Sequence, residues 1–320
     1  MPTSTPGSGP RARFTSAYQR VVDQWPVKVT GLNAPTDYGT THLLAAGDEA
    51  APVVLLLPGG SATATAWSAV AGQLAATRRV VAVDPIGQPG LSTPGQRPLK
   101  TAADLARWLD QVLDYLGVQR AALAGHSYGA WLALRYALHG PARVSQLVLL
   151  DPATCFAPLS LSYRFRSIPL IIRPSADRAR RLLAWETRGR PLDPDWLAVA
   201  ATGADLGRPQ IVLPAVPKPA ELAVLAVPAL VVVAARSRAH DPAQIAARAS
   251  ERLPEVTVQT LAQATHHTIP TEDATELAGY IAGFLASGSP AAGPFPALRS
   301  QCADPSPDGP QGGSHADVPH

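Results

Sequence analysis

The stretch that decides the fold reads AALAGHSYGAWLALRYALHG and covers residues 121–140. Its first four residues are small and apolar, which predicts a short buried strand over 121–124. The residues 128–138 predict a helix that ends near Gly140. Between strand and helix lies Gly125-His126-Ser127-Tyr128-Gly129, and the two glycines of this Gly-x-Ser-x-Gly pattern permit a sharp turn. This context favours an exposed, nucleophilic Ser127 over a chance glycine-rich turn.

Apolar runs and amphipathic stretches alternate on both sides of this turn. Such alternation is typical of parallel strands joined by helical crossovers, so we predict an α/β protein with a mostly parallel, doubly wound sheet. The expected strands cover residues 53–57, 79–83, 121–124, 144–150, 229–233 and 256–261, and the expected helices cover 65–76, 101–116, 128–138, 243–252 and 271–285.

The alternation stops between residues 155 and 226, where helical pieces and prolines occur without a convincing strand. This segment leaves and re-enters at strand ends that face the ligand crevice of an open sheet, so we expect it to form a helical lid. Residues 13–154 and 227–286 then form the core. Residues 1–12 and 287–320 are rich in proline, glycine and small polar residues, so we expect both ends to be disordered.

A serine needs a general base to become nucleophilic at neutral pH. Two adjacent histidines, His266 and His267, lie between the last expected strand and the last expected helix. A lone histidine is more often structural, but this loop position in a chain with the serine turn favours the role of base. The chain order serine, acid, histidine is typical of this arrangement.

A turn of small residues, Pro58-Gly59-Gly60-Ser61, follows the strand expected over 53–57. A backbone N–H at such a turn can point at the negative charge that develops on a carbonyl oxygen. We therefore assign the amides of Gly60 and Tyr128 as the donors of an oxyanion hole, although an ordinary strand-ending turn would also favour glycine.

Together these landmarks resemble the α/β-hydrolase superfamily over about residues 18–285. They are most similar to its esterase-like members from actinobacteria and bacilli. The similarity rests on residues 57–60, 84–92, 125–129 and 149–153, on His266, and on the upstream pair Trp25-Pro26. It implies the α/β-hydrolase fold with a helical lid and sets the class of reaction without setting the substrate.

The resemblance also bears on the choice of base. Counting forward from the strand expected over 256–261 puts His266 where the family has its histidine. Counting back from the last helix favours His267. A strand end fixes position better than a loop does, so we choose His266 and keep His267 as the alternative.

The resemblance leaves the catalytic acid with two candidates. The family's usual acid follows the penultimate strand, where Ser237 stands in this chain. Asp151 directly follows the strand expected over 144–150, a position that some superfamily members use for their acid. Asp241 precedes Pro242 and a predicted helix, so its side chain is expected to cap that helix. We choose Asp151 and keep Asp241 as the alternative.

Ser127, His266 and Asp151 would then form a Ser-His-Asp triad that hydrolyses a carboxylic ester, lactone or thioester through an acyl-enzyme. Two alternatives stay open: a non-hydrolytic or C–C bond-cleaving biosynthetic enzyme on the same scaffold, and a catalytically silent binding protein. Large lid residues such as Tyr163 and Phe165 favour a small apolar acyl substrate, although they are equally ordinary packing residues.

The composition argues against several other classes. The 320 residues carry a net charge of +3, and their scattered basic residues predict no nucleic-acid binding. Two cysteines without a Cys-x-x-Cys pair predict no metal site, and we expect no cofactor. The first residues lack the apolar core of a signal peptide, and the apolar runs are too short to span a bilayer. We therefore expect a cytoplasmic protein without a membrane partner.

The densest basic stretch lies between Arg173 and Arg190. We interpret it as the solvated face of a helix. A patch that guides an acidic substrate or carrier is the alternative.

Overall fold

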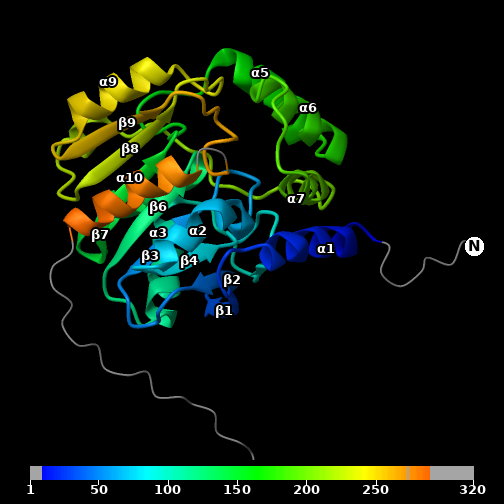
Figure 1. Cartoon of the computed structure of the whole chain (residues 1–320), viewed down its shortest axis with the longest axis horizontal. Helices are drawn as coiled ribbons and strands as arrows, with labels where there is room; N and C mark the ends of the chain where they lie inside the picture. Colours follow the sequence, from blue (N-terminus) through cyan, green and yellow to red (C-terminus); the bar gives the residue numbers. More distant parts are fainter. Residues whose placement is uncertain (1–8, 272–273, 289–320) are drawn as a thin grey trace, which may run out of the picture.

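The computed structural model describes residues 9–271 and 274–288, which form a twisted sheet with helices on both faces (Figure 1). The strands are β1 Thr30–Thr36, β2 Gly39–Ala46, β3 Val53–Leu57, β4 Arg79–Val83, β5 Thr93–Pro94, β6 Ala121–His126, β7 Val144–Leu150, β8 Ala229–Ala234 and β9 Val256–Leu261. Their order is β1-β2-β4-β3-β6-β7-β8-β9, and β5 pairs with β2. The pairs from β4 to β9 are parallel. The predicted doubly wound, mostly parallel sheet is therefore confirmed.

The helices follow the strands in alternation, apart from one long insertion. They are α1 Pro10–Asp23, α2 Ser68–Ala75, α3 Ala102–Tyr115, α4 Tyr128–His139, α5 Leu161–Ile172, α6 Ala176–Glu186, α7 Pro194–Ala204, α8 Pro219–Leu222, α9 Pro242–Arg252 and α10 Ala274–Ser287, with short 3-10 turns η1 Ala64–Trp67 and η2 Pro141–Arg143. None of these described helices is both long and apolar enough to cross a membrane.

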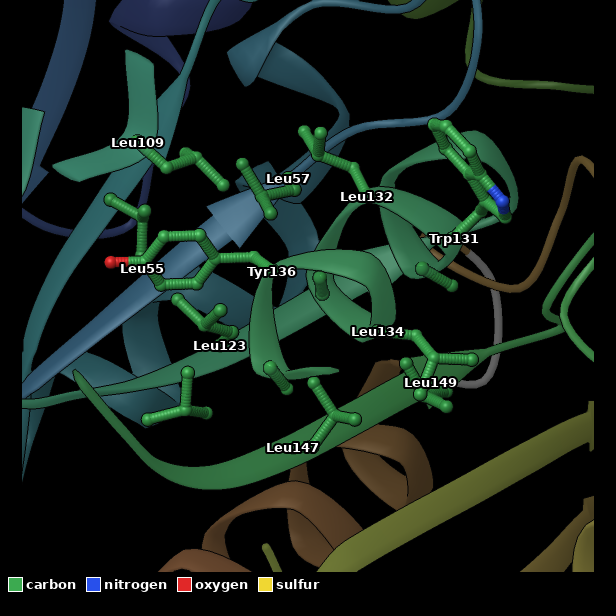
Figure 2. Close-up of a cluster of buried hydrophobic side chains, with 14 of the residues drawn as sticks. Leu55, Leu57, Leu109, Leu123, Trp131, Leu132, Leu134, Tyr136, Leu147 and Leu149 are labelled. Atoms are coloured by element: carbon green, nitrogen blue, oxygen red, sulfur yellow. The ribbon is translucent and has the colours of Figure 1, made fainter. Parts of the chain in front are cut away.

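The central strands are buried on both faces, which explains their continuous apolar runs. Because side chains alternate along a strand, Leu55 and Leu57 of β3 pack with α3 and α4, whereas Val54 and Leu56 pack with α2 and α10. Figure 2 shows the first of these two clusters, in which α4 covers β3, β6 and β7. The sheet thereby separates two apolar layers and holds the carboxyl ends of its strands at one edge.

Helices α5 to α8 all lie between β7 and β8 in the chain. The described residues 155–226 contain helices and loops but no strand. Figure 1 shows α5 and α6 side by side at the periphery of the molecule, beyond the ends of the central strands. The position of this insertion bears on the site described below.

The chain departs from the sequence-based expectation at its N-terminal part. Helix α1 begins at Pro10, so residues 10–12 belong to a helix and not to a disordered end. The side chains of Phe14 and Tyr18 are buried in the core and attach this helix to it. The guanidinium of Arg20 forms an ion pair with the carboxylate of Asp195 in α7, at 2.9 Å. At the other end, α10 extends to Ser287, one residue past the expected boundary. The expected disorder of residues 1–8 and 289–320 lies outside the described residues.

The antiparallel hairpin of β1 and β2 is absent from the sequence-based prediction. Strand β1 reads TGLNAPT and is largely exposed. An exposed edge strand needs no apolar alternation, so its sequence resembles that of a loop.

Candidate active site

Ser127 lies in a turn that only its glycine neighbours permit. Its backbone has a φ of 52°, in the left-handed region, and it directly precedes Tyr128, the first residue of α4. A Cβ atom at Gly125 would lie 2.2 Å from the carbonyl oxygen of Gly129, and a Cβ at Gly129 would lie 2.1 Å from that of Leu57. Both contacts are far below van der Waals separation, so β6, the turn and α4 approach this closely only with glycine at both positions.

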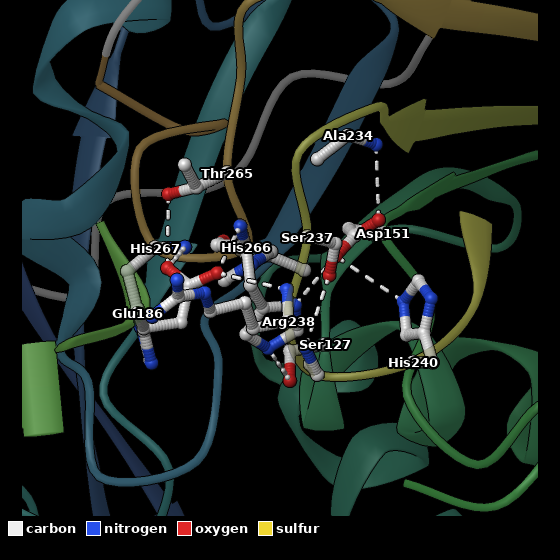
Figure 3. Close-up of polar contacts among 12 residues, drawn as sticks. Ser127, Asp151, Glu186, Ala234, Ser237, Arg238, His240, Thr265, His266 and His267 are labelled. Atoms are coloured by element: carbon white, nitrogen blue, oxygen red, sulfur yellow. Dashed lines mark hydrogen bonds and ion pairs between the residues drawn. The ribbon is translucent and has the colours of Figure 1, made fainter. Parts of the chain in front are cut away.

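Three side chains from separate parts of the chain meet at this turn (Figure 3). The Nε2 atom of His266 lies 2.8 Å from the Oγ atom of Ser127. Its Nδ1 atom lies 2.6 Å from Oδ2 of Asp151. The serine follows β6, the aspartate follows β7, and the histidine lies in the loop after β9. The structure thus brings together the three residues that we chose from the sequence.

The carboxylate of Asp151 is completely buried and has several further partners. The N–H of Ala234 donates to its Oδ1 at 3.0 Å, and the hydroxyl of Ser237 donates to its Oδ2 at 2.8 Å. His240 Nε2 lies 3.2 Å from the same Oδ2 atom. Burial alone would raise the pKa of Asp151, but the contacts with His240 and His266 outweigh it and hold that pKa well below its usual value.

Ser237 stands where the family usually has its catalytic acid, but in this chain it is a hydrogen-bond donor to Asp151. It follows β8, and its hydroxyl donates to the carboxylate that extends from the neighbouring strand β7. Asp241, the alternative acid, accepts the N–H groups of Ala243 and Gln244 at 3.0 and 3.2 Å and caps α9. Its side chain therefore already has the capping task that the sequence indicates.

His267, the alternative base, faces another partner. Its Nε2 atom lies 3.0 Å from the hydroxyl of Tyr163 in α5. Burial lowers the pKa of His267 to about 4, so its imidazole is neutral at pH 7. The ring of Tyr163 also meets that of His266 edge-on, with 5.8 Å between the ring centroids. Helix α5 of the insertion therefore contacts both histidines.

Gly60 and Tyr128, the assigned oxyanion donors, lie next to each other beside the serine. A Cβ at Gly60 would be 3.6 Å from Cβ of Tyr128. Tyr128 is the first residue of α4, and the N–H groups of a helix's first turn have no partner within the helix. Both backbones are thus in reach of one small region near Ser127.

Glu186 is a functional candidate that the sequence analysis did not find. It ends α6 and is fully buried. Its carboxylate accepts hydrogen bonds from N–H of His266 at 2.9 Å and of His267 at 3.1 Å, and from the hydroxyl of Thr265 at 2.9 Å. The N–H of Arg238 adds a longer bond at 3.3 Å. A single carboxylate of the insertion therefore binds the backbone of the loop that carries His266.

The charge of Glu186 is stabilised where it lies. Burial alone would raise its pKa, but the hydrogen bonds that it accepts, among them those from the N–H of His267 and the hydroxyl of Thr265, favour the charged form, and its pKa is lowered. No pattern in the sequence marks Glu186, since its partners lie about 80 residues further along the chain.

One group of residues could in principle hold a metal ion. Asp151, His240 and His266 offer ligand atoms that lie within 4.8 Å of one another, and no other such group occurs among the described residues. The 2.6 Å between His266 Nδ1 and Asp151 Oδ2 is a hydrogen-bond distance, and a metal ion would have to replace that bond. The geometry therefore fits a hydrogen-bonded pair better than two metal ligands.

Comparison with known proteins places this site in a family. Residues 54–279 match the model of the alpha/beta hydrolase family. Carboxylesterase YbfK of Bacillus subtilis is 35% identical over 144 residues, which cover 45% of this chain and 48% of that protein. A 2-hydroxymuconate semialdehyde hydrolase of Pseudomonas putida is 36% identical over 125 residues, which cover 38% of this chain and 42% of that protein. The matched segments thus span about half, or less, of the length of these curated relatives.

The similarity in structure extends further. The crystal structure of carboxylesterase CesB (YbfK) superimposes with a TM-score of 0.82 at 26% identity and covers 88% of this chain and 99% of that one. The structure of naproxen esterase from Bacillus subtilis gives a TM-score of 0.79 at 25% identity and covers 88% of this chain and all of that one. The fold, the strand–turn–helix at Ser127 and the family match agree, and the chain belongs to the alpha/beta hydrolase family.

Proposed function

We propose that this protein hydrolyses carboxylic esters through an acyl-enzyme formed on Ser127. The observation that carries the proposal is the continuous hydrogen-bonded series from Ser127 Oγ through His266 to Asp151. The carboxylesterases among its relatives support the same reaction class. Lactones and thioesters react by the same steps and belong to the same proposal.

The proposed reaction has two halves, and His266 acts first as base and then as acid in each of them. His266 Nε2 takes the proton of Ser127 as Oγ attacks the ester carbonyl carbon, and Asp151 stabilises the imidazolium that forms. The carbonyl oxygen gains negative charge and is received by the amides of Gly60 and Tyr128. The alcohol leaves with the proton from His266. Water then gives a proton to the same imidazole as it attacks the acyl carbon, and Ser127 Oγ takes that proton back as the carboxylic acid leaves.

We infer that the helical segment 155–226 is the lid of this site and shapes an acyl pocket for small apolar acyl groups. The contacts of Tyr163 with His266 and His267 support this assignment, since they place α5 directly beside the proposed base. Glu186 supports it from α6. A lid that contacts the base in this way would exclude water around the reacting ester.

A second candidate function is hydrolytic cleavage of a C–C bond, because one relative is a 2-hydroxymuconate semialdehyde hydrolase. A third possibility, a catalytically silent binding protein, has less support because the serine, histidine and aspartate are hydrogen-bonded to one another. Turnover of p-nitrophenyl esters of graded chain length, alongside 2-hydroxymuconate semialdehyde, distinguishes all three candidates. Ester hydrolysis predicts turnover of the first substrates only.

Replacement of the proposed nucleophile should abolish catalysis without unfolding the protein. Ser127→Ala should lower kcat for a p-nitrophenyl ester by about four or more decades, because no covalent intermediate can form. Ser145→Ala, near the amino end of β7, is the control and should keep full activity. A Ser127→Ala protein that retains most of its kcat would show that another group is the nucleophile.

The two candidate acids should respond in opposite ways. Asp151→Asn should lower kcat by about three to four decades, because an amide can hold the imidazole in the wrong tautomer. Asp241→Asn should cost about 1 kcal/mol or less of unfolding free energy, measured in urea, and leave kcat unchanged. An inactive Asp241→Asn variant together with an active Asp151→Asn variant would show that the catalytic acid is Asp241, which follows β8, and not Asp151.

Removing the charge of Glu186 should displace the histidine loop. Every hydrogen-bond partner of the Glu186 carboxylate is a donor. The side-chain amide of Glu186→Gln would therefore point its own N–H groups at one or more of these donors. We expect about a tenfold to hundredfold lower kcat with a small change in KM, and about 1–3 kcal/mol less unfolding free energy. Asp177→Asn, an exposed carboxylate on the same helix, is the matched control. Wild-type kcat in Glu186→Gln would rule out a positioning role.

A further inference from the structure

Helix α5 presents an apolar stripe to solvent. Leu161, Phe165, Ile168 and Ile172 recur at intervals of four, three and four residues, which aligns them along one side of a helix. They are 41–69% exposed, and α5 has no buried residue at all. Phe165, one of the lid residues that favoured an apolar substrate in the sequence analysis, is exposed to solvent instead. Large apolar side chains gathered on one exposed face are typical of an interaction site.

The opposite side of α5 faces the protein. Tyr163 lies there, with its hydroxyl 3.0 Å from His267. The exposed stripe and the contact with the proposed base are therefore on opposite sides of the same helix. Figure 1 shows this helix and α6 at the outer limit of the molecule, where a large flat partner could reach them.

The segment around α5 and α6 is also strongly basic. Residues 152–192 contain eight arginines but only two carboxylates, a net charge of +6, whereas the rest of the chain has a net charge of −3. Of the two carboxylates, Glu186 is buried at the histidine loop and Asp177 lies 3.4 Å from Arg180. The arginines are Arg164, Arg166, Arg173, Arg178, Arg180, Arg181, Arg188 and Arg190.

Cations lie beside this stripe and between α5 and α6. With 3.6 residues per turn, Arg164 falls at the edge of the stripe, whereas Arg166 falls about 130° from its centre. The guanidinium of Arg166 lies over the ring of Trp185 in α6, 4.9 Å from its centroid. An exposed apolar stripe with cations beside it is typical of helices that lie in the interface of an anionic bilayer.

We propose that the outer face of α5, together with the arginines of α5 and α6, docks the protein on an anionic lipid bilayer. Two other partners fit less well. A two-fold dimer through this face would oppose two strongly positive surfaces. An acidic protein would neutralise the arginines but leave the reason for the central apolar side chains unexplained. The proposal departs from our expectation of no membrane partner, which rested on the lack of a leader and of a spanning segment, and it does not depend on ester hydrolysis.

Flotation of the full chain with lipid vesicles tests this proposal without any turnover. The vesicles contain phosphatidylglycerol and phosphatidylcholine in equal parts, or phosphatidylcholine alone. We expect binding to the anionic vesicles that weakens steeply with added NaCl, since salt screens the arginines, and little binding to the neutral ones. Absence of binding to anionic vesicles at low salt would overturn the proposal.

Variants then locate the surface. Phe165→Ser with Ile168→Ser should weaken binding about tenfold or more, because two side chains no longer enter the bilayer. Arg180→Gln with Arg181→Gln should weaken it about fivefold for each arginine and flatten the salt dependence. Val224→Ser, which removes a side chain that is 76% exposed outside this face, is the control. Binding equal to wild type in both double variants would overturn the proposal.

The same variants test the competing partners. Sedimentation velocity compares the oligomeric state of the wild type with that of the Phe165→Ser, Ile168→Ser variant. We expect the double substitution to leave the oligomeric state unchanged, so that no dimer is lost. Such a dimer, without vesicle binding, would assign the face to a second copy of the chain instead. Because the four positions of the two double variants are exposed, their unfolding free energies should stay within about 0.5 kcal/mol of wild type.

Discussion

The buried carboxylate of Asp151 is the group around which the site is organised. A charge in a fully buried position is tolerated only with hydrogen-bonding or charged partners. Here those partners come from the end of β8, from the loop after it through Ser237 and His240, and from the loop after β9 through His266. The same contacts that stabilise the charge therefore hold the loops after β8 and β9 and orient the imidazole towards Ser127.

A second buried carboxylate holds the same histidine loop from the other side. Asp151 binds the side chain of His266, whereas Glu186 binds the backbone of His266 and His267. Because Glu186 belongs to the inserted helices, the insertion helps to support the loop that carries His266. This arrangement gives a physical reason why changes in α5 and α6, including contacts made at their outer surface, could reach the proposed base.

The sequence predicted the features that depend on local pattern. The buried strands and the glycine turn at Ser127 follow from apolar runs and from steric limits. The place of Asp151 at a strand end follows from the same apolar runs, whereas its role as the acid stays a prediction. The features that it missed depend on distant contacts or on weak patterns. Glu186 meets partners about 80 residues away, β1 is an exposed edge strand, and α1 begins directly after a sequence rich in proline, glycine and small polar residues, which is typical of a flexible end. The outward position of Phe165 also could not be known before the packing of α5.

The central claim is that Ser127 is activated by His266 and not by His267. Reaction with a fluorophosphonate probe, followed by mass analysis of the labelled peptide, tests both halves of this claim at once. We predict one adduct, on the peptide that contains Ser127, formed at the wild-type rate in His267→Ala and at a rate lower by decades in His266→Ala. An adduct on another residue, or a slow His267→Ala beside a fast His266→Ala, would contradict the account.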